Sequence, residues 1–256
     1  MSIETDAEKE ESGWWETAKI IIQALILAMI VRVFFYQPFN IPSGSMKSTL
    51  LVGDYLFVSK LSYGYSRYSF TLPLIGEPVR FSDRIFAGTP KRGDVAVFRL
   101  PSQDSIDYIK RVIGLPGDEV QMIGGILHIN GTAVPKRETG TFDDYVEGDR
   151  MPIRVRTYEE TLPNGVKYTV LDEVPNGRYD KTRVFKVPPG HYFMMGDNRD
   201  SSMDSRTPDV GFVPIENFVG RAEIIFFSTS GSYASLIQPW RWPFEIRWSR
   251  FLKMVR

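Results

Sequence analysis

The chain has 256 residues, of which 43% are hydrophobic and 24% are charged; these proportions are close to the globular average and exclude a wholly disordered chain. Its 31 basic and 31 acidic residues leave no net charge, which argues against a dedicated nucleic-acid-binding protein, because such proteins need a basic surface to neutralise phosphates. Cysteine is absent and the only histidines are His128 and His191, so thiol nucleophiles and disulfides are excluded, and we expect no metal and no cofactor.

The first predicted element is an apolar helix near the N-terminus. Residues 20–36 read IIIQALILAMIVRVFFY, with only two polar side chains. Counted from Trp14, whose indole and that of Trp15 suit the headgroup level, the stretch is roughly 34 Å long as a helix, which is enough to cross a bilayer. We therefore predict a transmembrane anchor over residues 17–36.

This helix has two other interpretations. A helix buried in a soluble core would have a similar composition and remains open. A cleavable signal peptide fits less well, because acidic residues precede the apolar run and no A-x-A-like site follows it. The flanking Lys and Arg residues are nearly balanced, so they give no orientation.

From residue 37 onward the sequence indicates a mostly β protein. Short β-branched and aromatic runs alternate with Pro and Gly, and no long helical period is present. The runs are DYLFVSK, GDVAVFRL, YIKRVIGL, GGILHING, VKYTVLDEV and RAEIIFFS. Residues 121–189 are richer in charge and turns and carry an Asn-Gly hairpin signal at 164–165, which predicts an inserted second β lobe.

The C-terminal segment after Gln238 mixes tryptophan with arginine and lysine in PWRWPFEIRWSRFLKMVR. This composition suits an anionic lipid interface. A packed terminal strand or helix with a solvated basic face explains it equally well.

Three blocks carry side chains that can do chemistry. FNIPSGSM contains Ser43 and Ser45 on either side of a glycine, YIKRVIGLPGD places Lys110 beside apolar residues, and GDNRDSSMDSR is a dense polar loop. Taken alone, each block is typical of an ordinary loop or edge strand.

Together with RGDVAVFRLP, these blocks occur in the order, and after the single apolar segment, that one family shows. From about Val31 to Phe227 the sequence resembles bacterial type I signal peptidase, the leader peptidase. The resemblance implies a membrane serine endopeptidase that removes signal peptides from secretory preproteins through an acyl-enzyme. It also implies a Ser-Lys dyad and cleavage after small residues at A-x-A-like sites.

The resemblance also assigns roles to individual residues. Ser45 matches the nucleophile and Lys110 the general base, while Ser43 matches the serine whose hydroxyl joins the backbone N–H of the nucleophile in the oxyanion hole. Ser202 matches the serine that hydrogen-bonds and orients the lysine. Asp204 and Arg206 match supporting acidic and basic positions, and Asp197 and Arg199 belong to the same loop of the family. The positions that line the substrate groove are matched by Ile41, Pro42, Met46, Leu50, Tyr108 and Ile109.

Two positions depart from the family pattern. Ser48 stands where the family usually has proline, and Ser201 stands where it usually has asparagine. Neither change removes a catalytic group, so we expect them to affect loop rigidity and not the mechanism.

The chemistry of lysine agrees with this assignment. A serine hydroxyl needs a nearby base, and neither histidine lies in the blocks. At the unperturbed pKa of about 10.4 only roughly one lysine in 2,500 is neutral at pH 7, so the base must be desolvated. The apolar neighbours of Lys110 are suited to that.

The resemblance completes the predicted organisation. Its parts are a cytoplasmic segment 1–16, the anchor 17–36, a catalytic β domain 37–120 and 190–232, the inserted lobe 121–189 and a tail 233–256. The chain would cross the bacterial inner membrane once, with its catalytic domain on the periplasmic side and with preproteins and the lipid bilayer as partners. The rival hypotheses are a mitochondrial or chloroplast relative, and a non-catalytic membrane-tethered β scaffold in which Ser45 and Lys110 are accidental.

Overall fold

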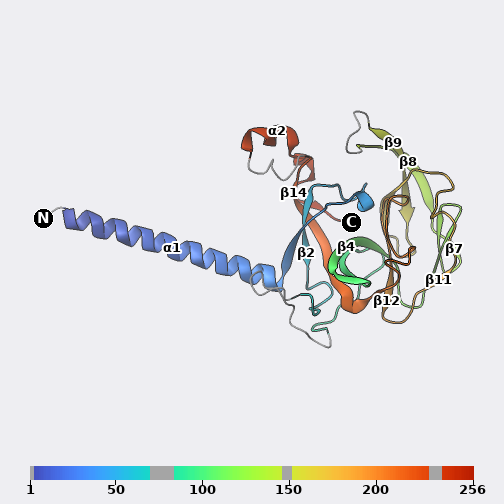
Figure 1. Ribbon diagram of the computed structural model, residues 1–256, viewed down its shortest axis with the longest axis horizontal. Helices are drawn as coiled ribbons and strands as arrows, with labels where there is room; N and C mark the ends of the chain where they lie inside the picture. The colour runs from blue at the N-terminus through green and yellow to red at the C-terminus, as the bar shows by residue number, and fades with distance from the viewer. Residues whose placement is uncertain (1–2, 70–83, 146–151, 231–237) are drawn as a thin grey trace.

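The computed structural model describes residues 3–69, 84–145, 152–230 and 238–256 (Figure 1). A long N-terminal helix leads into a β-rich body, and the strands of the inserted segment lie on the side of that body away from the helix. This arrangement confirms the predicted fold class. The predicted boundary between residues 232 and 233 falls outside the described residues.

Helix α1 (Ile3–Phe34) projects away from the body (Figure 1). Its apolar stretch Trp14–Phe34 has 21 residues and a mean hydropathy of 2.0, and none of it is buried. A core helix would be buried, so the structure does not support that interpretation. The helix ends two residues before the predicted end of the anchor, because Tyr36 already begins a strand.

The end of α1 is fastened to the body by two side chains. Lys60 donates from Nζ to the carbonyl of Val33 at 3.1 Å, and Tyr65 donates from its hydroxyl to the carbonyl of Phe34 at 2.7 Å. The last carbonyls of a helix lack partners within the helix, so these bonds satisfy them. Burial, together with the charge of Arg32, lowers the pKa of Lys60 to about 8.

The main sheet has eight strands, which follow one another in the order β1-β2-β14-β3-β4-β12-β13, with β15 paired to β14. The strands are β1 (Tyr36–Asn40), β2 (Asp54–Ser59), β3 (Val95–Leu100), β4 (Gln103–Gly114), β12 (His191–Met195), β13 (Val213–Pro214), β14 (Phe218–Ser228) and β15 (Lys253–Met254). All their pairings are antiparallel. Strand β1 lies at an edge, where Pro38 is tolerated because an edge strand can lack one backbone donor.

The inserted segment forms two smaller sheets. One joins β10, β9 and β8 in that order, and the other joins β11, β5, β6 and β7. Their bounds are β5 (Glu119–Ile123), β6 (Ile126–Ile129), β7 (Thr132–Ala133), β8 (Lys136–Asp144), β9 (Ile153–Thr161), β10 (Lys167–Asp172) and β11 (Phe185–Lys186). The predicted hairpin at 164–165 is confirmed between β9 and β10, where Gly165 adopts a φ of +83° that suits glycine.

The apolar core of the inserted segment is continuous with the main sheet. Ile113 of β4 and Phe193 and Met195 of β12 belong to the same buried cluster as Leu127 and Val170 of the inserted strands. Because this packing is shared, a displacement of the inserted sheets would reach β4 and β12 directly.

The short helices lie in loops and near the C-terminus. They are η1 (Gly44–Met46), η2 (Ile215–Asn217), η4 (Pro239–Arg241), α2 (Trp242–Glu245) and η5 (Trp248–Arg250). The C-terminal segment packs against the main sheet. Strand β15 pairs with β14, and Arg250 binds the fully buried Asp54 with N···O distances of 2.5 and 2.9 Å. Trp240 and Phe244 nevertheless remain 71% and 88% exposed.

We predict that Arg250→Met destabilises the fold by about 3 kcal/mol, because it leaves the Asp54 carboxylate buried without its counter-charge. The matched control is Arg241→Met, whose ion pair with Glu245 involves an arginine side chain that is 50% exposed and should contribute less than about 1 kcal/mol. Thermal unfolding of the detergent-solubilised protein, followed by circular dichroism, measures both. Equal shifts in the two midpoints would contradict the prediction.

Candidate active site

The hydroxyl of Ser45 and the amine of Lys110 meet inside the protein. Ser45 lies in η1, directly after the chain leaves β1, and Lys110 lies on β4 opposite Ala96 of β3. The distance from Lys110 Nζ to Ser45 Oγ is 2.6 Å, and the two residues are 3% and 8% exposed. A hydroxyl hydrogen-bonded to a buried amine can act as a nucleophile if the amine accepts its proton.

Desolvation dominates the electrostatics of Lys110. Burial lowers its pKa to about 8, although the charges of Asp204 and Asp197 oppose this change. The Tyr108 ring lies over the amine, with its centroid 5.1 Å from Nζ. Lys110 forms no ion pair with any carboxylate of the described chain. The charges of Asp204 and Asp197 therefore compensate only part of the effect of burial on its pKa.

Asp197 is occupied by a different cation. Arg111, the residue after Lys110, donates to both carboxylate oxygens at 2.8 and 2.7 Å, and Thr49 donates to one of them at 2.5 Å. Both members of the ion pair are buried. Asp197 therefore binds Arg111 and not the lysine.

Asp204 also has its own arginine. Arg206 donates to both oxygens of Asp204 at 2.8 Å, and the backbone N–H of Gly196 donates to one of them at 3.0 Å. Burial alone would raise the pKa of Asp204, but the charge and hydrogen bonds of Arg206 outweigh burial and lower it. Asp204 therefore stays ionised near Lys110.

Gly196 separates Ser45 from Ser202. A Cβ atom at this position would lie 2.2 Å from Ser202 Oγ and 2.5 Å from the carbonyl oxygen of Ser45, so only glycine fits. The buried Ser202 hydroxyl contributes to the lowered pKa of Asp204, although its geometry falls short of a regular hydrogen bond within the described chain. Ser202 matches the serine expected to hydrogen-bond and orient the lysine; it lies across Gly196 from the Ser45 carbonyl, but within the described chain it forms no hydrogen bond to Lys110.

Arg199 is bound by the inserted lobe. It forms a two-pronged ion pair with Glu160 of β9, at 2.9 and 2.6 Å, and donates to the Tyr168 hydroxyl of β10 at 3.0 Å. Burial would lower the pKa of Arg199, but Glu160 and Tyr168 outweigh it and raise that pKa. The five predicted residues lie in one loop, Gly196–Arg206, and the side chains of Asp197 and Arg199 have partners on β4, β9 and β10.

The residues predicted to line a groove divide into two groups. Met46 and Leu50 are fully buried and pack with Leu56 and Val58, so in this structure they support the loop that carries Ser45 and are not exposed on a groove surface. Ile41 is also buried in that cluster. Pro42 is exposed, and Tyr108 and Ile109 are half-buried beside Lys110 on β4. Ser43 is exposed and precedes η1 in an extended conformation.

Ser48 takes a conformation that proline cannot adopt. Its φ is +83°, whereas the proline ring fixes φ near −65°. The Ser48 hydroxyl donates to the carbonyl of Thr169 in β10 at 2.7 Å, and the neighbouring Lys47 pairs with Asp144 of β8. The loop that carries Ser45 is thus held by the inserted lobe at the position where it departs from the family pattern. Ser201 is exposed and has no comparable contact within the described chain.

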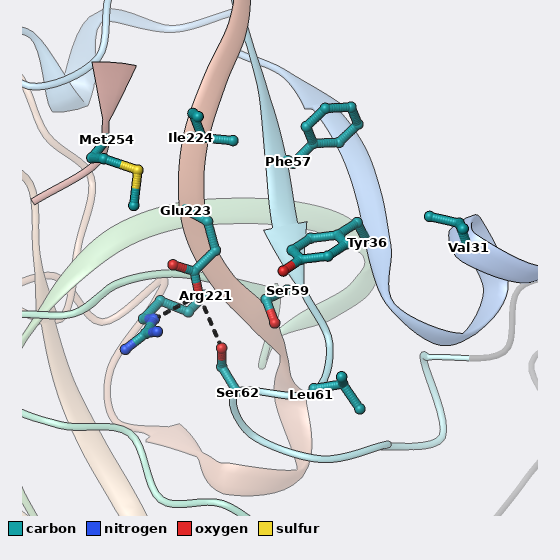
Figure 2. A pocket seen from close by; sticks show the side chains of 10 residues that line it. All are labelled: Val31, Tyr36, Phe57, Ser59, Leu61, Ser62, Arg221, Glu223, Ile224 and Met254. Carbon is teal, nitrogen blue, oxygen red and sulfur yellow. Dashed lines mark hydrogen bonds and ion pairs between the residues drawn. The ribbon is translucent and has the colours of Figure 1, made fainter. Parts of the chain in front are cut away.

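Two other features of the surface lie away from Ser45 and Lys110. A cavity of about 760 Å³ lies between the end of α1 and the edge of the main sheet, lined by Val31 and Tyr36 on one side and by Arg221 and Glu223 on the other (Figure 2). It contains neither Ser45 nor Lys110.

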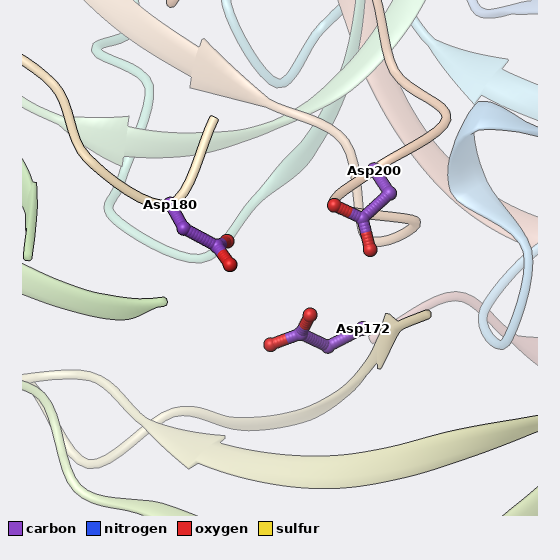
Figure 3. Close-up of side chains that lie close together, drawn as sticks. All are labelled: Asp172, Asp180 and Asp200. Carbon is purple, nitrogen blue, oxygen red and sulfur yellow. The ribbon is translucent and has the colours of Figure 1, made fainter. Parts of the chain in front are cut away.

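The side chains of Asp172, Asp180 and Asp200 point toward one another within 4.8 Å (Figure 3). This is the kind of donor set that a hard cation prefers. Lys136 already pairs with Asp172, and Asp200 accepts two backbone N–H groups of the inserted lobe. These contacts indicate that the three carboxylates help to join the inserted lobe to the Gly196–Arg206 loop.

Comparison with known proteins identifies the family. The family described as "Signal peptidase, peptidase S26" matches residues 14–227. The chain belongs to this signal peptidase family. Signal peptidase I of Rickettsia akari (strain Hartford) is 44% identical over 84% of this chain and 79% of that protein. The enzyme of Rickettsia conorii (strain ATCC VR-613 / Malish 7) is 46% identical over 80% of this chain and 76% of that protein.

Among solved structures, a signal peptidase I from Enterococcus faecalis V583 matches 52% of this chain and 96% of that chain, with 25% identity and a TM-score of 0.31. The sequence relatives confirm the predicted family and enzyme class. As a signal peptidase, the chain is a serine peptidase, and its substrates are secretory preproteins.

Sequence reasoning missed two residues of this signal peptidase site. Arg111 could have been found, because an arginine inside an apolar strand must be paired when it is buried. Glu160 could not, since the charged run that contains it is typical of a solvated strand face. Its burial depends on Arg199, which arrives from a distant part of the chain.

Proposed function

We propose that Ser45 and Lys110 form the catalytic dyad of a membrane-anchored signal peptidase. The observation that carries this proposal is the 2.6 Å contact between Ser45 Oγ and the buried Nζ of a lysine with a lowered pKa. With a pKa of about 8, about one lysine in ten is neutral at pH 7, compared with roughly one in 2,500 without the shift.

The reaction proceeds in two halves. Neutral Lys110 takes the Ser45 proton as Oγ attacks the scissile carbonyl, and the protonated lysine then gives that proton to the leaving amine as the C–N bond breaks. The products of this half are the free amine of the mature protein and an ester on Ser45. Lys110 next takes a proton from the water that attacks the ester and returns it to Ser45 Oγ as the ester C–O bond breaks, which releases the signal peptide with a free carboxyl group.

Ser43 serves as an oxyanion donor together with the backbone N–H of Ser45. Its exposed position directly before η1 supports this role, because the hydroxyl is free to turn toward a bound carbonyl. Asp197, Arg199, Ser202, Asp204 and Arg206 support the dyad by holding the Gly196–Arg206 loop against it.

The substrate binds as an extended strand, with small residues at the first and third positions before the cleavage site. Strand β12 pairs with β4 only from Arg111 onward, so residues 103–110 of β4 pair only with β3 among the described strands. The edge of β4 at Tyr108 and Ile109 can therefore add a substrate strand, and the exposed Pro42 precedes Ser45 in the chain by three residues.

Helix α1 anchors the enzyme in the bacterial inner membrane, with residues 1–16 in the cytoplasm and the β-rich body on the periplasmic side. The exposed apolar length of α1 supports this proposal. A membrane-anchored active site meets the preprotein at the point where the apolar segment of the preprotein leaves the bilayer.

We expect Ser45→Ala and Lys110→Met each to lower kcat on a peptide with an A-x-A site by at least about 10⁴-fold, with a double variant no worse than either single one, because the two groups act as a unit. Lys60→Met is a matched control. Lys60 is also buried and its pKa is also lowered to about 8, yet it is bonded to the end of α1 and should be dispensable for peptide cleavage. Near-normal turnover by Ser45→Ala would exclude the dyad.

The second expectation concerns pH. Since the neutral form of Lys110 is active and its pKa is about 8, kcat/KM should rise about tenfold per pH unit below that value and level off above it. A pH–rate profile of peptide cleavage tests this. An acidic limb near the usual histidine pKa of about 6.5 would instead implicate His128 or His191.

For Ser43→Ala we expect a loss of about 10²- to 10³-fold in kcat with little change in KM, because the lost donor acts on the transition state. Ser43→Thr keeps a hydroxyl and should recover a substantial part of the rate. Ser102→Ala, which removes another exposed hydroxyl, is the control. If Ser43→Ala mainly raised KM, the residue would belong to substrate binding.

A further inference from the structure

The Gly196–Arg206 loop is joined to β10 by backbone hydrogen bonds. Leu171 donates its N–H to the carbonyl of Asp197 and accepts the N–H of Arg199, both at 2.9 Å. The Asp200 carboxylate accepts the N–H groups of Glu173 and Val174 at 2.7 and 2.9 Å. The loop thus continues the three-stranded sheet of the inserted lobe.

One charged side chain of that sheet reaches into the loop. Glu160 of β9 is fully buried and binds the guanidinium of Arg199 through both carboxylate oxygens, while the Tyr168 hydroxyl donates to Oε2 of Glu160 at 2.6 Å. A two-pronged bond between a carboxylate and a guanidinium fixes direction as well as distance. Glu160 therefore determines where Arg199 lies.

Arg199 in turn holds the part of the loop that contacts the nucleophile. Its Nε donates to the Gly196 carbonyl at 3.2 Å, and its own carbonyl accepts a bond from Arg206 at 2.7 Å. Gly196 lies against the carbonyl of Ser45, and that carbonyl accepts the N–H of Asn198 at 3.1 Å. A continuous series of contacts thus leads from Glu160 to the backbone of Ser45.

The nucleophile loop also rests on the same sheet from the other side, through the bonds of Lys47 to Asp144 and of Ser48 to Thr169. Both loops of the site are therefore bonded to strands β8, β9 and β10. A sheet that holds both loops can fix the distance between Ser45 and the residues around Lys110.

We propose that Glu160 is a positioning residue for signal-peptide cleavage, which acts through Arg199 to hold the Gly196–Arg206 loop against Ser45. This inference rests on the proposed dyad and assigns the inserted lobe a role in turnover. Glu160 does not touch the substrate, so its effect should appear in kcat and not in KM.

The test compares Glu160→Gln with Glu159→Gln in the full-length, detergent-solubilised enzyme. Glu159 is the next residue on β9, and its ion pairs with Arg137 and Lys167 involve arginine and lysine side chains that are 76% and 62% exposed. The assay is cleavage of an A-x-A peptide, at a temperature at which circular dichroism shows each variant to be fully folded.

We expect Glu160→Gln to lower kcat by about 10- to 100-fold, because small displacements in an active site have effects of this size, with KM changed less than about twofold. Glu159→Gln should match the parent enzyme. Since Glu160 acts through Arg199, the double variant Glu160→Gln/Arg199→Met should have the same kcat as Arg199→Met alone.

A merely structural role would lower the unfolding midpoint of Glu160→Gln and leave kcat of the folded enzyme unchanged, and that result would overturn the inference. If Glu160→Gln does not fold, Tyr168→Phe decides, because it removes only the hydroxyl shared by Glu160 and Arg199 and should give a smaller fall in kcat; an unchanged kcat would overturn the proposal. Ser45→Ala in the same assay separates this failure from a failure of the dyad, since only the latter leaves Ser45→Ala active.

Discussion

The burial of the Lys110 amine is the constraint on which the site depends. An ammonium group that is 3% exposed and has no carboxylate in ion-pair contact within the described chain loses hydration, and its hydrogen bonds to Ser45 and to the Ile109 carbonyl supply no counter-charge. Its neutral form is favoured as a result. The same environment places Ser45 Oγ within hydrogen-bond distance of Lys110 Nζ. The amine whose neutral form is favoured by burial is therefore the group that can accept the proton of the Ser45 hydroxyl.

Carboxylates near a lysine would normally restore its charge, and two of them lie near Lys110. Each of these carboxylates, however, is bound by an arginine through both oxygens: Asp197 by Arg111 and Asp204 by Arg206. Such pairs hold the local charge nearly balanced and leave the lysine without a counter-ion. They also fix the Gly196–Arg206 loop, because buried charges that lose a partner are strongly destabilising.

The elements that were predicted correctly depend on local sequence. The apolar length of α1, the β-branched runs and the Asn-Gly turn each report on a few adjacent residues, and the structure has the helix, the strands and the hairpin at those places. Ser45 and Lys110 were assigned through short motifs. That they lie 2.6 Å apart, after a separation of 65 residues, is information that only the fold contains.

The features that were missed depend on contacts between distant segments. Nothing in the run around Glu160 distinguishes it from Glu159, yet Glu160 is fully buried whereas the Glu159 side chain is 29% exposed. The difference arises because Arg199 arrives at one face of β9. Likewise, the sequence indicated that Ser48 departs from the family pattern, but only the backbone conformation, with its φ of +83°, shows how the loop turns there.

The protonation state of Lys110 can be observed directly by NMR of protein labelled with ¹³C in the lysine ε-carbons. Spectra of Lys110→Met and Lys60→Met assign the two buried lysines, and the ε-carbon shift of Lys110 is followed against pH. The account predicts a midpoint near the pKa of about 8. A midpoint at the ordinary lysine pKa of 10.5 would contradict it, because a lysine that is fully charged near neutrality cannot serve as the base for Ser45.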